Sequence, residues 1–289
     1  MKLSIVLATR NEEKNIGECL ATVKKIADEI IVYDESSTDN TASVARSFGA
    51  SVVTVAHEDN FHITKQKAID AAKSEWILQL DADERVPKAL AEEIKQVISM
   101  SSGEIKKRRP DDLNKERLFK RHMAVIEKRD GVIGKATGEI VAFFIPRLNY
   151  FVGAPIKHSG VYPDPAIRLI KRGKARLPAR SVHEIMEIDG EIAWLYEDMH
   201  HHDSPTISRY IVRLNRYTDL QCVEMKSSDT NKDALRLLWF TCIKPVSVFF
   251  KLYFRHKGYE DGLRGFLWAA FSSMHFPLAY YKYWTYSRV

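Results

Sequence analysis

The chain has 289 residues, 45% of them hydrophobic and 28% charged, and a formal net charge of +6. This length can bury a sizeable core, as one large domain or as a domain with an appendage. The positive charge favours anionic partners: nucleotides, phospholipid surfaces or nucleic acid. The three cysteines, Cys19, Cys222 and Cys242, are odd in number and far apart, which excludes a disulfide framework or a Cys-x-x-Cys metal site. Reduced, cytosolic thiols are therefore expected.

Short apolar runs alternate with amphipathic segments over the first hundred residues. The pattern predicts strands at residues 3–8, 29–33, 51–55 and 76–80, and helices at residues 11–26, 41–48, 61–73 and 87–98. Asn11 is the expected N-cap of the first helix, and Pro87 opens the last one. The first run is too short for a signal peptide. Strands alternating with helices at crossover spacing predict an α/β fold with a doubly wound, mostly parallel sheet and helices on both faces.

Three carboxylates follow the fourth apolar run: Asp81, Asp83 and Glu84. A short apolar run bounded by charge is typical of a buried parallel strand, and open α/β sheets bind ligands at the carboxyl ends of such strands. Asp81 and Asp83 are two residues apart, so an extended backbone directs both side chains to one side. Paired oxygen ligands suit Mg²⁺ or Mn²⁺, which keep waters and share their other positions with substrate phosphates. The pattern predicts a metal–diphosphate site.

An Asp-x-Asp pair by itself is compatible with two different roles. It is often only a polar turn after a strand. A phosphatase with an aspartyl nucleophile also places the pair there, but its pattern usually continues with Thr or Val where this chain has Arg85. Polar clusters at residues 9–12 and 34–39 should gather along the same sheet edge. The sequence contains no Gly-x-Gly-x-x-Gly or Gly-Lys-Ser/Thr loop, so a dinucleotide site or a P-loop is unsupported.

Each of three segments runs from a predicted strand into a polar cluster: residues 6–12 (VLATRNE), 32–41 (VYDESSTDNT) and 76–84 (WILQLDADE). In this order and spacing they resemble the family 2 glycosyltransferases, which have the GT-A fold. Residues 149–153, 162–164, 168–175 and 182–184 resemble the bacterial subgroup that adds sugars to lipopolysaccharide core or related glycans. The resemblance covers nearly the whole chain and is weakest at about residues 100–135.

The resemblance implies an inverting, metal-dependent enzyme that moves a sugar from a nucleoside-diphosphate sugar to a hydroxyl. The donor is expected to be a UDP-sugar, and the acceptor a glycan or lipid-linked molecule in cell-envelope polysaccharide biosynthesis. Two other functions stay open: a non-catalytic nucleotide-sugar-binding or scaffold protein, and a nucleotidyltransferase. The last should carry a glycine-rich loop after the first strand, where residues 8–12 contain no glycine. No nucleic-acid partner is expected, and a homo-oligomer stays possible.

The resemblance also assigns roles to single residues. The donor-binding residues that it implies are Thr9, Asn11, Glu12, Asp34, Lys65, Asp81 and Arg168. Mg²⁺ or Mn²⁺ is expected on Asp83, with Asp81 binding the ribose or the metal, and His201 is the expected third ligand. A carboxylate pair favours these hard metals over zinc. Glu184 is the expected general base, with Asp164 as its competitor.

Structural roles are the alternatives for several of these residues. Glu184 could instead form an ion pair with Arg168 or Arg180, and Lys65 could face solvent on its helix. An Asx turn that caps the following helix is assigned to Asp39 rather than to Asp34. Arg172 could assist Arg168 in holding a diphosphate or an acidic acceptor, because arginine forks match phosphate oxygens.

The predicted domains are a GT-A catalytic domain at residues 1–225 and a helical segment at residues 226–289. The catalytic domain is divided into a nucleotide-sugar half (about 1–100), a basic insertion (about 101–135) and an acceptor half (about 136–225). The insertion is either a solvated loop or lid, or a patch for an acceptor or an anionic lipid.

The C-terminal segment is rich in aromatic and basic residues. Its longest apolar stretch, residues 266–281, is shorter than the roughly 20 residues of a spanning helix, and His275 and Pro277 interrupt it. Such a composition suits an interfacial helix on an anionic leaflet. We expect a cytoplasmic protein in peripheral contact with the inner face of the cytoplasmic membrane. The alternative is a helical cap that packs on the sheet or on a second copy.

Overall fold

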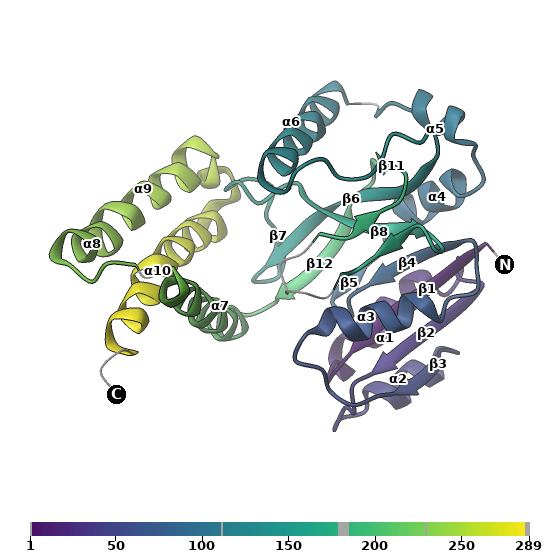
Figure 1. The fold of residues 1–289 in the computed structure, drawn as a ribbon, viewed down its shortest axis with the longest axis horizontal. Coiled ribbons are helices and arrows are strands. Elements are labelled where there is room, and N and C mark those ends of the chain that lie inside the picture. Colours follow the sequence, from purple (N-terminus) through teal and green to yellow (C-terminus); the bar gives the residue numbers. More distant parts are fainter. Residues whose placement is uncertain (1, 111, 179–184, 229, 287–289) are drawn as a thin grey trace. The chain divides into compact units, whose positions relative to one another are not determined.

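The computed structural model describes residues 2–110, 112–178, 185–228 and 230–286 (Figure 1). Contacts within the chain divide it into two compact units. The first comprises Met1–Arg147 and Pro163–His201, and the second comprises Leu148–Tyr162 and His202–Val289. The predicted boundary between residues 225 and 226 falls inside helix α7 (Ile207–Ser227), and all of α7 belongs to the second unit.

The main sheet has the strand order β3-β2-β1-β4-β8-β6-β12-β5, with β7 and β11 also paired to β6. Its strands are β1 (Leu3–Thr9), β2 (Glu29–Asp34), β3 (Ser51–Thr54), β4 (Trp76–Leu80), β5 (Glu84–Arg85), β6 (Ile140–Phe151), β7 (Ala154–Pro155), β8 (Asp164–Lys171), β11 (Glu191–Trp194) and β12 (Met199–Ser204). Strands β1 to β4 run parallel, and β8 is antiparallel to β4 and β6. Strands β9 (Ala175–Arg176) and β10 (Glu187–Ile188) form a separate two-stranded sheet.

Helices cover both faces of the parallel half of the sheet (Figure 1). The helices of the first unit are α1 (Glu13–Val23), α2 (Thr41–Ser47), α3 (Phe61–Asp70), α4 (Lys88–Val97), α5 (Ser102–Lys107) and α6 (Leu113–Asp130). Successive strand residues face opposite sides. Leu7 therefore packs in one core cluster with Leu20 of α1, whereas Val6 packs in the other with Ala68 of α3. The predicted α/β fold, with helices on both faces of the sheet and a C-terminal helical region, is confirmed.

The first helix begins later than the sequence predicts. Glu12 stands in the N-cap position and makes no side-chain capping bond, so the prediction that Asn11 caps this helix is wrong. Asn11 instead has a positive φ of 55°, in the left-handed region that asparagine tolerates. Its side-chain oxygen accepts a hydrogen bond from the Thr38 backbone N–H at 2.8 Å. The residue therefore links two loops rather than starting a helix.

The basic insertion, residues 101–135, is largely helical. Ser101 and Glu104 form a capping box at the start of α5. Phe119 of α6 is buried and stacks on Trp194, with ring centroids 4.2 Å apart. Arg108, one of the cations of this stretch, forms an ion pair with the largely buried Glu93. Part of the basic stretch therefore serves folding.

The second unit is mainly helical. Helix α7 is followed by a continuous helix, Ala234–Arg255, and by α10 (Gly262–Tyr286). The middle helix comprises α8 (Ala234–Leu238), α9 (Lys244–Phe250) and two π-helical segments, Trp239–Ile243 and Lys251–Arg255. Its Phe240 stacks on Tyr280 of α10 at 4.7 Å, beside Cys222 and Met225 of α7. By length and composition, Ala234–Arg255 could cross a membrane.

Candidate active site

Two loops at the carboxyl end of the parallel strands are joined by hydrogen bonds. The backbone N–H of Asn11 donates to Ser37 Oγ at 2.9 Å, and the N–H of Glu12 donates to Thr41 Oγ1 at 2.7 Å. Strands β1 and β2 pair in register, so Thr9 lies opposite Asp34. The polar clusters at residues 9–12 and 34–41 therefore form one connected surface at this edge.

The Asx turn that the sequence assigns to Asp39 is confirmed, because Asp39 Oδ1 accepts from the backbone N–H of Thr41, two residues on, at 3.0 Å. Asp34 shapes the other end of the same loop. Its two carboxylate oxygens accept from the backbone N–H of Ser37 at 3.0 Å and from the Ser37 hydroxyl at 2.6 Å. Asp39 also has a capping role, because it accepts from the backbone N–H groups of Thr41 and Glu13. Both aspartates therefore shape this loop.

Asp81 follows β4 and is held between two cations. Its Oδ1 atom lies 2.5 Å from Lys65 Nζ of α3, and its Oδ2 atom accepts from Arg168 Nη2 of β8 at 2.6 Å. Burial alone would raise the pKa of Asp81, but the positive charges of Arg168 and Lys65 outweigh burial and hold it well below its ordinary value. This carboxylate is therefore ionised at neutral pH.

Glu84 lies behind Asp81 and is completely buried. Its Oε1 atom lies 2.7 Å from Arg168 Nη2 and 3.5 Å from Arg147 Nη1, and its Oε2 atom accepts from the Asp81 backbone N–H at 2.9 Å. Arg147 also pairs with Asp164 at 2.6 Å. A buried carboxylate needs such partners because an unpaired charge in the interior is costly. Glu84 thereby fixes both the backbone and the arginine that surround Asp81.

Asp83, two residues after Asp81, faces His201 of strand β12. Strand β5 pairs antiparallel with β12, so His201 lies opposite Glu84, and its Nε2 atom is 3.6 Å from Asp83 Oδ2. Because strand side chains alternate, His200 and His202 leave the backbone on the other side from His201. The ring of His202 stacks on Tyr150 at 4.1 Å. The three adjacent histidines thus have different surroundings.

The donor atoms at this corner fit a hard divalent cation. Asp83 and His201 supply one oxygen and one nitrogen, whereas both oxygens of Asp81 already contact cations. Among the residues that the structure describes, no group of three or more His, Cys, Asp or Glu side chains is arranged to hold a metal. Mg²⁺ and Mn²⁺ commonly take few protein ligands and complete their shell with water and substrate phosphate.

The pKa of Asp83 lies below its ordinary value. Burial of the carboxyl group would raise this pKa, but the interaction with His201 outweighs burial.

The structure brings most of the predicted site residues into one region of the first unit. Lys65, Asp81 and Arg168 are in direct contact, Asp83 faces His201, and Asp164 joins them through Arg147. Glu184, the predicted base, lies outside the described residues. Sequence inspection assigns no role to Gln79, Glu84 or Arg147. The position of Glu84 in the same acidic run as Asp81 and Asp83 could have indicated a role in the site. No local sequence pattern indicates such a role for Arg147.

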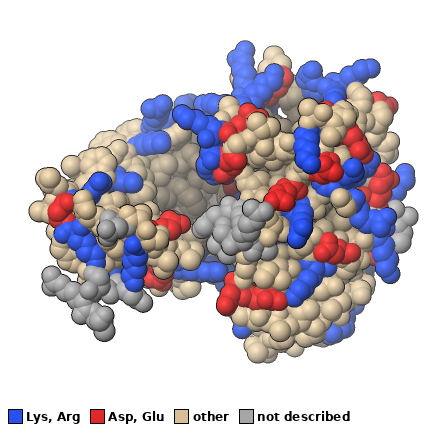
Figure 2. Space-filling model, viewed as in Figure 1, with Lys and Arg blue, Asp and Glu red and all other residues tan. Residues whose placement is uncertain are grey.

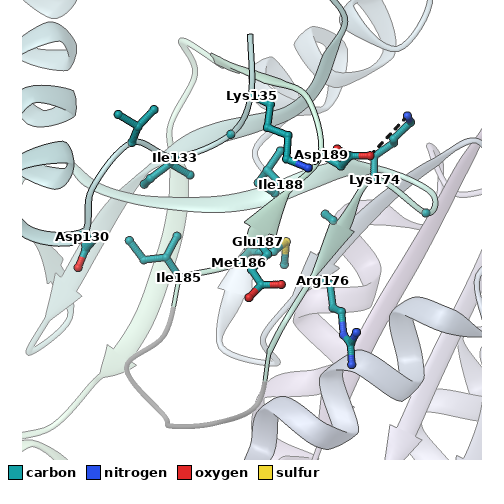
Figure 3. Close-up of a pocket in the computed structure, with 14 residues that line it drawn as sticks. Asp130, Ile133, Lys135, Lys174, Arg176, Ile185, Met186, Glu187, Ile188 and Asp189 are labelled. Atoms are coloured by element: carbon teal, nitrogen blue, oxygen red, sulfur yellow. Dashed lines mark hydrogen bonds and ion pairs between the residues drawn. The ribbon is translucent and has the colours of Figure 1, made fainter. Parts of the chain in front are cut away.

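A cavity of about 490 Å³ lies elsewhere in the first unit (Figure 3). Ile133, Ile185, Met186 and Ile188 are among its apolar lining residues, and Lys135 and Lys174 stand near Asp189. Lys135 Nζ lies 2.8 Å from the Asp189 carboxylate. Among the predicted site residues that the structure describes, none lines this cavity, so it is distinct from the Asp81–Asp83 corner.

By sequence, the chain is similar to known glycosyltransferases. Residues 4–117 match the family model Glycosyl transferase family 2. The chain is 26% identical over 273 residues to the lipopolysaccharide core biosynthesis glycosyltransferase LpsC of Rhizobium meliloti, a match that covers 92% of this chain and 86% of that protein. Over 98 residues it is 41% identical to an uncharacterized glycosyltransferase of Rickettsia bellii, covering 34% of this chain and 33% of the other.

Solved structures show weaker likenesses. The S. aureus TarS 1–349 structure in complex with UDP has a TM-score of 0.42 and 14% identity, over 91% of this chain and 75% of that one. A glucosyl-3-phosphoglycerate synthase from Mycobacterium tuberculosis with Mn²⁺ and UDP-glucose has a TM-score of 0.33 and 20% identity, over 45% of this chain and 51% of that one. Both likenesses are too distant to assign a function.

The α/β sheet and the sequence match define the class of the protein, a glycosyltransferase. Its residues 4–117 are similar to the family 2 glycosyltransferases.

Proposed function

We propose that this enzyme transfers a sugar, with inversion and with the help of Mg²⁺ or Mn²⁺, from a UDP-sugar to a hydroxyl group. The acceptor is a glycan or lipid-linked molecule of cell-envelope polysaccharide biosynthesis. The name of the Rhizobium relative, a lipopolysaccharide core glycosyltransferase, supports this acceptor class. The observation that carries the proposal is the facing pair Asp83–His201 beside the cation-held Asp81, at the carboxyl edge of the sheet.

The donor base and ribose are proposed to lie over the ends of β1 and β2. Thr9 Oγ1 is buried and has no hydrogen-bond partner among the described residues. Buried hydroxyls normally find a partner, and the hydroxyl and carbonyl groups of a nucleoside would supply one. Asn11 and Glu12 hold the two flanking loops together, which prepares this surface before the donor binds.

The proposed reaction is one displacement. The acceptor oxygen attacks the anomeric carbon, the bond from that carbon to the diphosphate oxygen breaks, and the nucleoside diphosphate leaves with the electron pair. A divalent cation held by Asp83 and His201 would supply charge neutralisation for the leaving diphosphate. Lys65 and Arg168 keep the Asp81 carboxylate ionised and in place.

The acceptor proton is proposed to go to Glu184, in keeping with the family resemblance. Asp164, the competing base, forms an ion pair with Arg147 at 2.6 Å. The carboxylate is therefore already occupied by a protein partner. Asp164 is therefore the second choice.

We also propose that the protein acts at the inner face of the cytoplasmic membrane, because a lipid-linked acceptor would be presented there. The net charge of +6 supports contact with an anionic leaflet.

The donor proposal is tested by thermal unfolding with a panel of nucleotide sugars and Mn²⁺. A donor at about 100 times its Kd should add roughly 2.7 kcal/mol to the free energy of unfolding. Asp83→Asn should lose the Mn²⁺-dependent part of this gain, whereas the control Glu92→Gln, at an exposed carboxylate of α4, should keep it. If no nucleotide sugar stabilises the wild-type protein, or if both variants behave alike, the proposed donor site is wrong.

A further inference from the structure

The helix Ala234–Arg255 carries a row of apolar side chains that point into solvent. These side chains recur every three or four residues, which places them on one face of a helix. They are Leu235, Trp239, Ile243, Val246, Phe250 and Phe254, each between 43% and 80% exposed. We call this row the outward stripe. Within the most apolar 18 residues of this helix, only 11% are buried in the structure.

The rest of the helix is already packed within the second unit. Phe240 and Pro245 are buried, and Phe249 contacts the ring of Phe266 in α10 at 5.7 Å. Lys244 Nζ lies 4.5 Å from the ring centre of Phe276. The helix therefore has one face on α10 and a second, equally apolar face that no described residue covers. A contiguous exposed apolar face of this kind marks an interaction site.

The charge around the stripe indicates what covers it. Helix Ala234–Arg255 contains four basic residues and no Asp or Glu. From the start of this helix to the first turns of α10 the acidic residues are Glu260, which pairs with Lys257, and Asp261, and the basic residues are Arg236, Lys244, Lys251, Arg255, Lys257 and Arg264. Figure 2 shows Lys and Arg side chains beside uncharged surface in the region of α8 and α9. Aromatic and aliphatic side chains flanked by cations are the composition of helices that lie in an anionic bilayer surface.

We propose that the outward stripe seats in the headgroup region of a membrane containing anionic lipids, with the helix axis parallel to the bilayer plane. The apolar side chains would enter the acyl boundary, and the exposed cations Arg236, Lys251 and Arg255 would meet lipid phosphates. This inference deepens the proposed membrane contact by naming the surface that makes it. It needs the second unit alone and does not depend on the chemistry of the first.

A spanning arrangement of the same helix is less favourable. Its 22 residues are long enough, but Lys244 stands at the middle of the helix, where a cation in a bilayer centre costs about 2.5–3.5 kcal/mol or more. In the plane of the membrane the same lysine stays over the rings of Phe240 and Phe276, within the protein. Spanning would also strip the helix from α10, on which it packs.

A second copy of this chain fits the stripe poorly. Two copies meeting through it would bring the same cations face to face, and the helix offers no carboxylate to pair with them. Like charges in a buried interface disfavour association. An anionic lipid surface removes this repulsion.

The stripe is one part of the C-terminal segment, residues 226–289, in which the sequence places the membrane contact, and it lies outside the longest apolar stretch of that segment. In residues 266–281, Ala269, Pro277, Ala279 and Tyr280 are buried within the second unit. That stretch mainly builds the helical core. The apolar surface left for a partner belongs to the preceding helix.

Flotation of the full-length protein with lipid vesicles tests the proposal. Wild-type protein should float with phosphatidylcholine vesicles containing about 30% phosphatidylglycerol and much less with phosphatidylcholine alone. The triple variant Trp239→Ser, Val246→Ser, Phe250→Ser should bind the anionic vesicles about 100-fold more weakly, because three apolar side chains no longer leave water. A matched triple, Leu113→Ser, Val125→Ser, Val132→Ser, removes three exposed apolar residues of the first unit and should bind like wild type.

Several flotation results would overturn the proposal. Equal flotation of the stripe variant and wild type overturns it, as does equal loss in the matched control. Protein that stays with the vesicles after alkaline carbonate washing would indicate a spanning helix instead. Lipid-free wild type that sediments as a dimer, with a monomeric stripe variant and no flotation, would assign the stripe to a second copy.

Donor binding keeps the two proposals separate. The stripe variant should retain the wild-type Kd for a UDP-sugar with Mn²⁺, measured by titration calorimetry without lipid. Vesicle binding without any donor binding in the wild type would refute the proposed transfer and leave the membrane surface intact. Donor binding without vesicle binding would refute the proposed membrane surface and leave the proposed transfer intact.

Discussion

The guanidinium group of Arg168 lies 2.6 Å from the Asp81 carboxylate and keeps that side chain at the carboxyl end of β4. The same group bonds the buried Glu84 at 2.7 Å and the side-chain oxygen of Gln79. Burial alone would lower the pKa of Arg168, but the two carboxylates outweigh it and raise the pKa above its ordinary value. Arg168 is therefore a permanent cation that holds Asp81 and Glu84 in place. Its guanidinium group is engaged by these side chains and by Gln79, rather than free to bind the diphosphate.

Removing this cation should destabilise the fold. Arg168→Met leaves Glu84 with one fewer buried partner, and breaking a buried pair typically costs about 3–5 kcal/mol. Urea unfolding measures the free energy. Arg129→Met, at an exposed pair with Asp130, is the control and should change stability by less than about 1 kcal/mol. Adding Glu84→Gln to Arg168→Met should cost less than Glu84→Gln alone; additive losses would show that the two residues act independently.

Asp81 should make stability depend on acid pH. Its pKa is lower in the folded protein than in the unfolded chain, where an aspartate titrates near pH 3.9. The unfolded chain therefore takes up the proton first. The stability contribution is complete above about pH 5 and is lost as the pH falls through about 4 towards the folded pKa. Free energies of unfolding at about pH 5, 4 and 3 should fall less steeply for Asp81→Asn than for wild type. Parallel curves would contradict this.

Glu184→Gln should reduce sugar transfer by about 10²–10⁴-fold if this residue is the general base. Donor binding should be unchanged, since the loss concerns proton removal from the acceptor. Single-turnover rates with a UDP-sugar, combined with calorimetry, separate the two effects. Asp164→Asn is the comparison: if it abolishes transfer while Glu184→Gln keeps it, the base is Asp164.

One of the three cysteines should react in the native protein. Cys19 and Cys222 are buried, and burial raises the pKa of the Cys19 thiol, which keeps it from forming the reactive thiolate. Cys242 is exposed, on the helix that carries the outward stripe. An Ellman titration should therefore find one fast thiol in native protein and three after denaturation. Cys242→Ser should remove the fast reaction; a second fast thiol would mean that the packing around α1 or α7 opens.

Much of the parallel half of the sheet is determined by local sequence. The strand that the sequence predicts at residues 76–80 has the same bounds as β4, and its apolar run is buried from end to end. Apolar periodicity reports which face each segment buries, so α1 to α4 and their strands are predictable within a few residues. The Asp-x-Asp pair and its place at the end of a strand are likewise properties of contiguous sequence.

Tertiary structure alone decided which distant side chains meet these aspartates. Arg168 and Arg147 come from strands β8 and β6, which reach Glu84 only because β8 pairs antiparallel with β4 and β6. His201 faces Asp83 because β12 pairs with β5, a contact that no local pattern encodes. The outward stripe escapes sequence inspection for a similar reason: the sequence shows that residues 234–281 are apolar, but packing decides which apolar face is left uncovered. Hydrophobic pattern determines the elements, whereas register and packing between elements far apart in the chain determine the site.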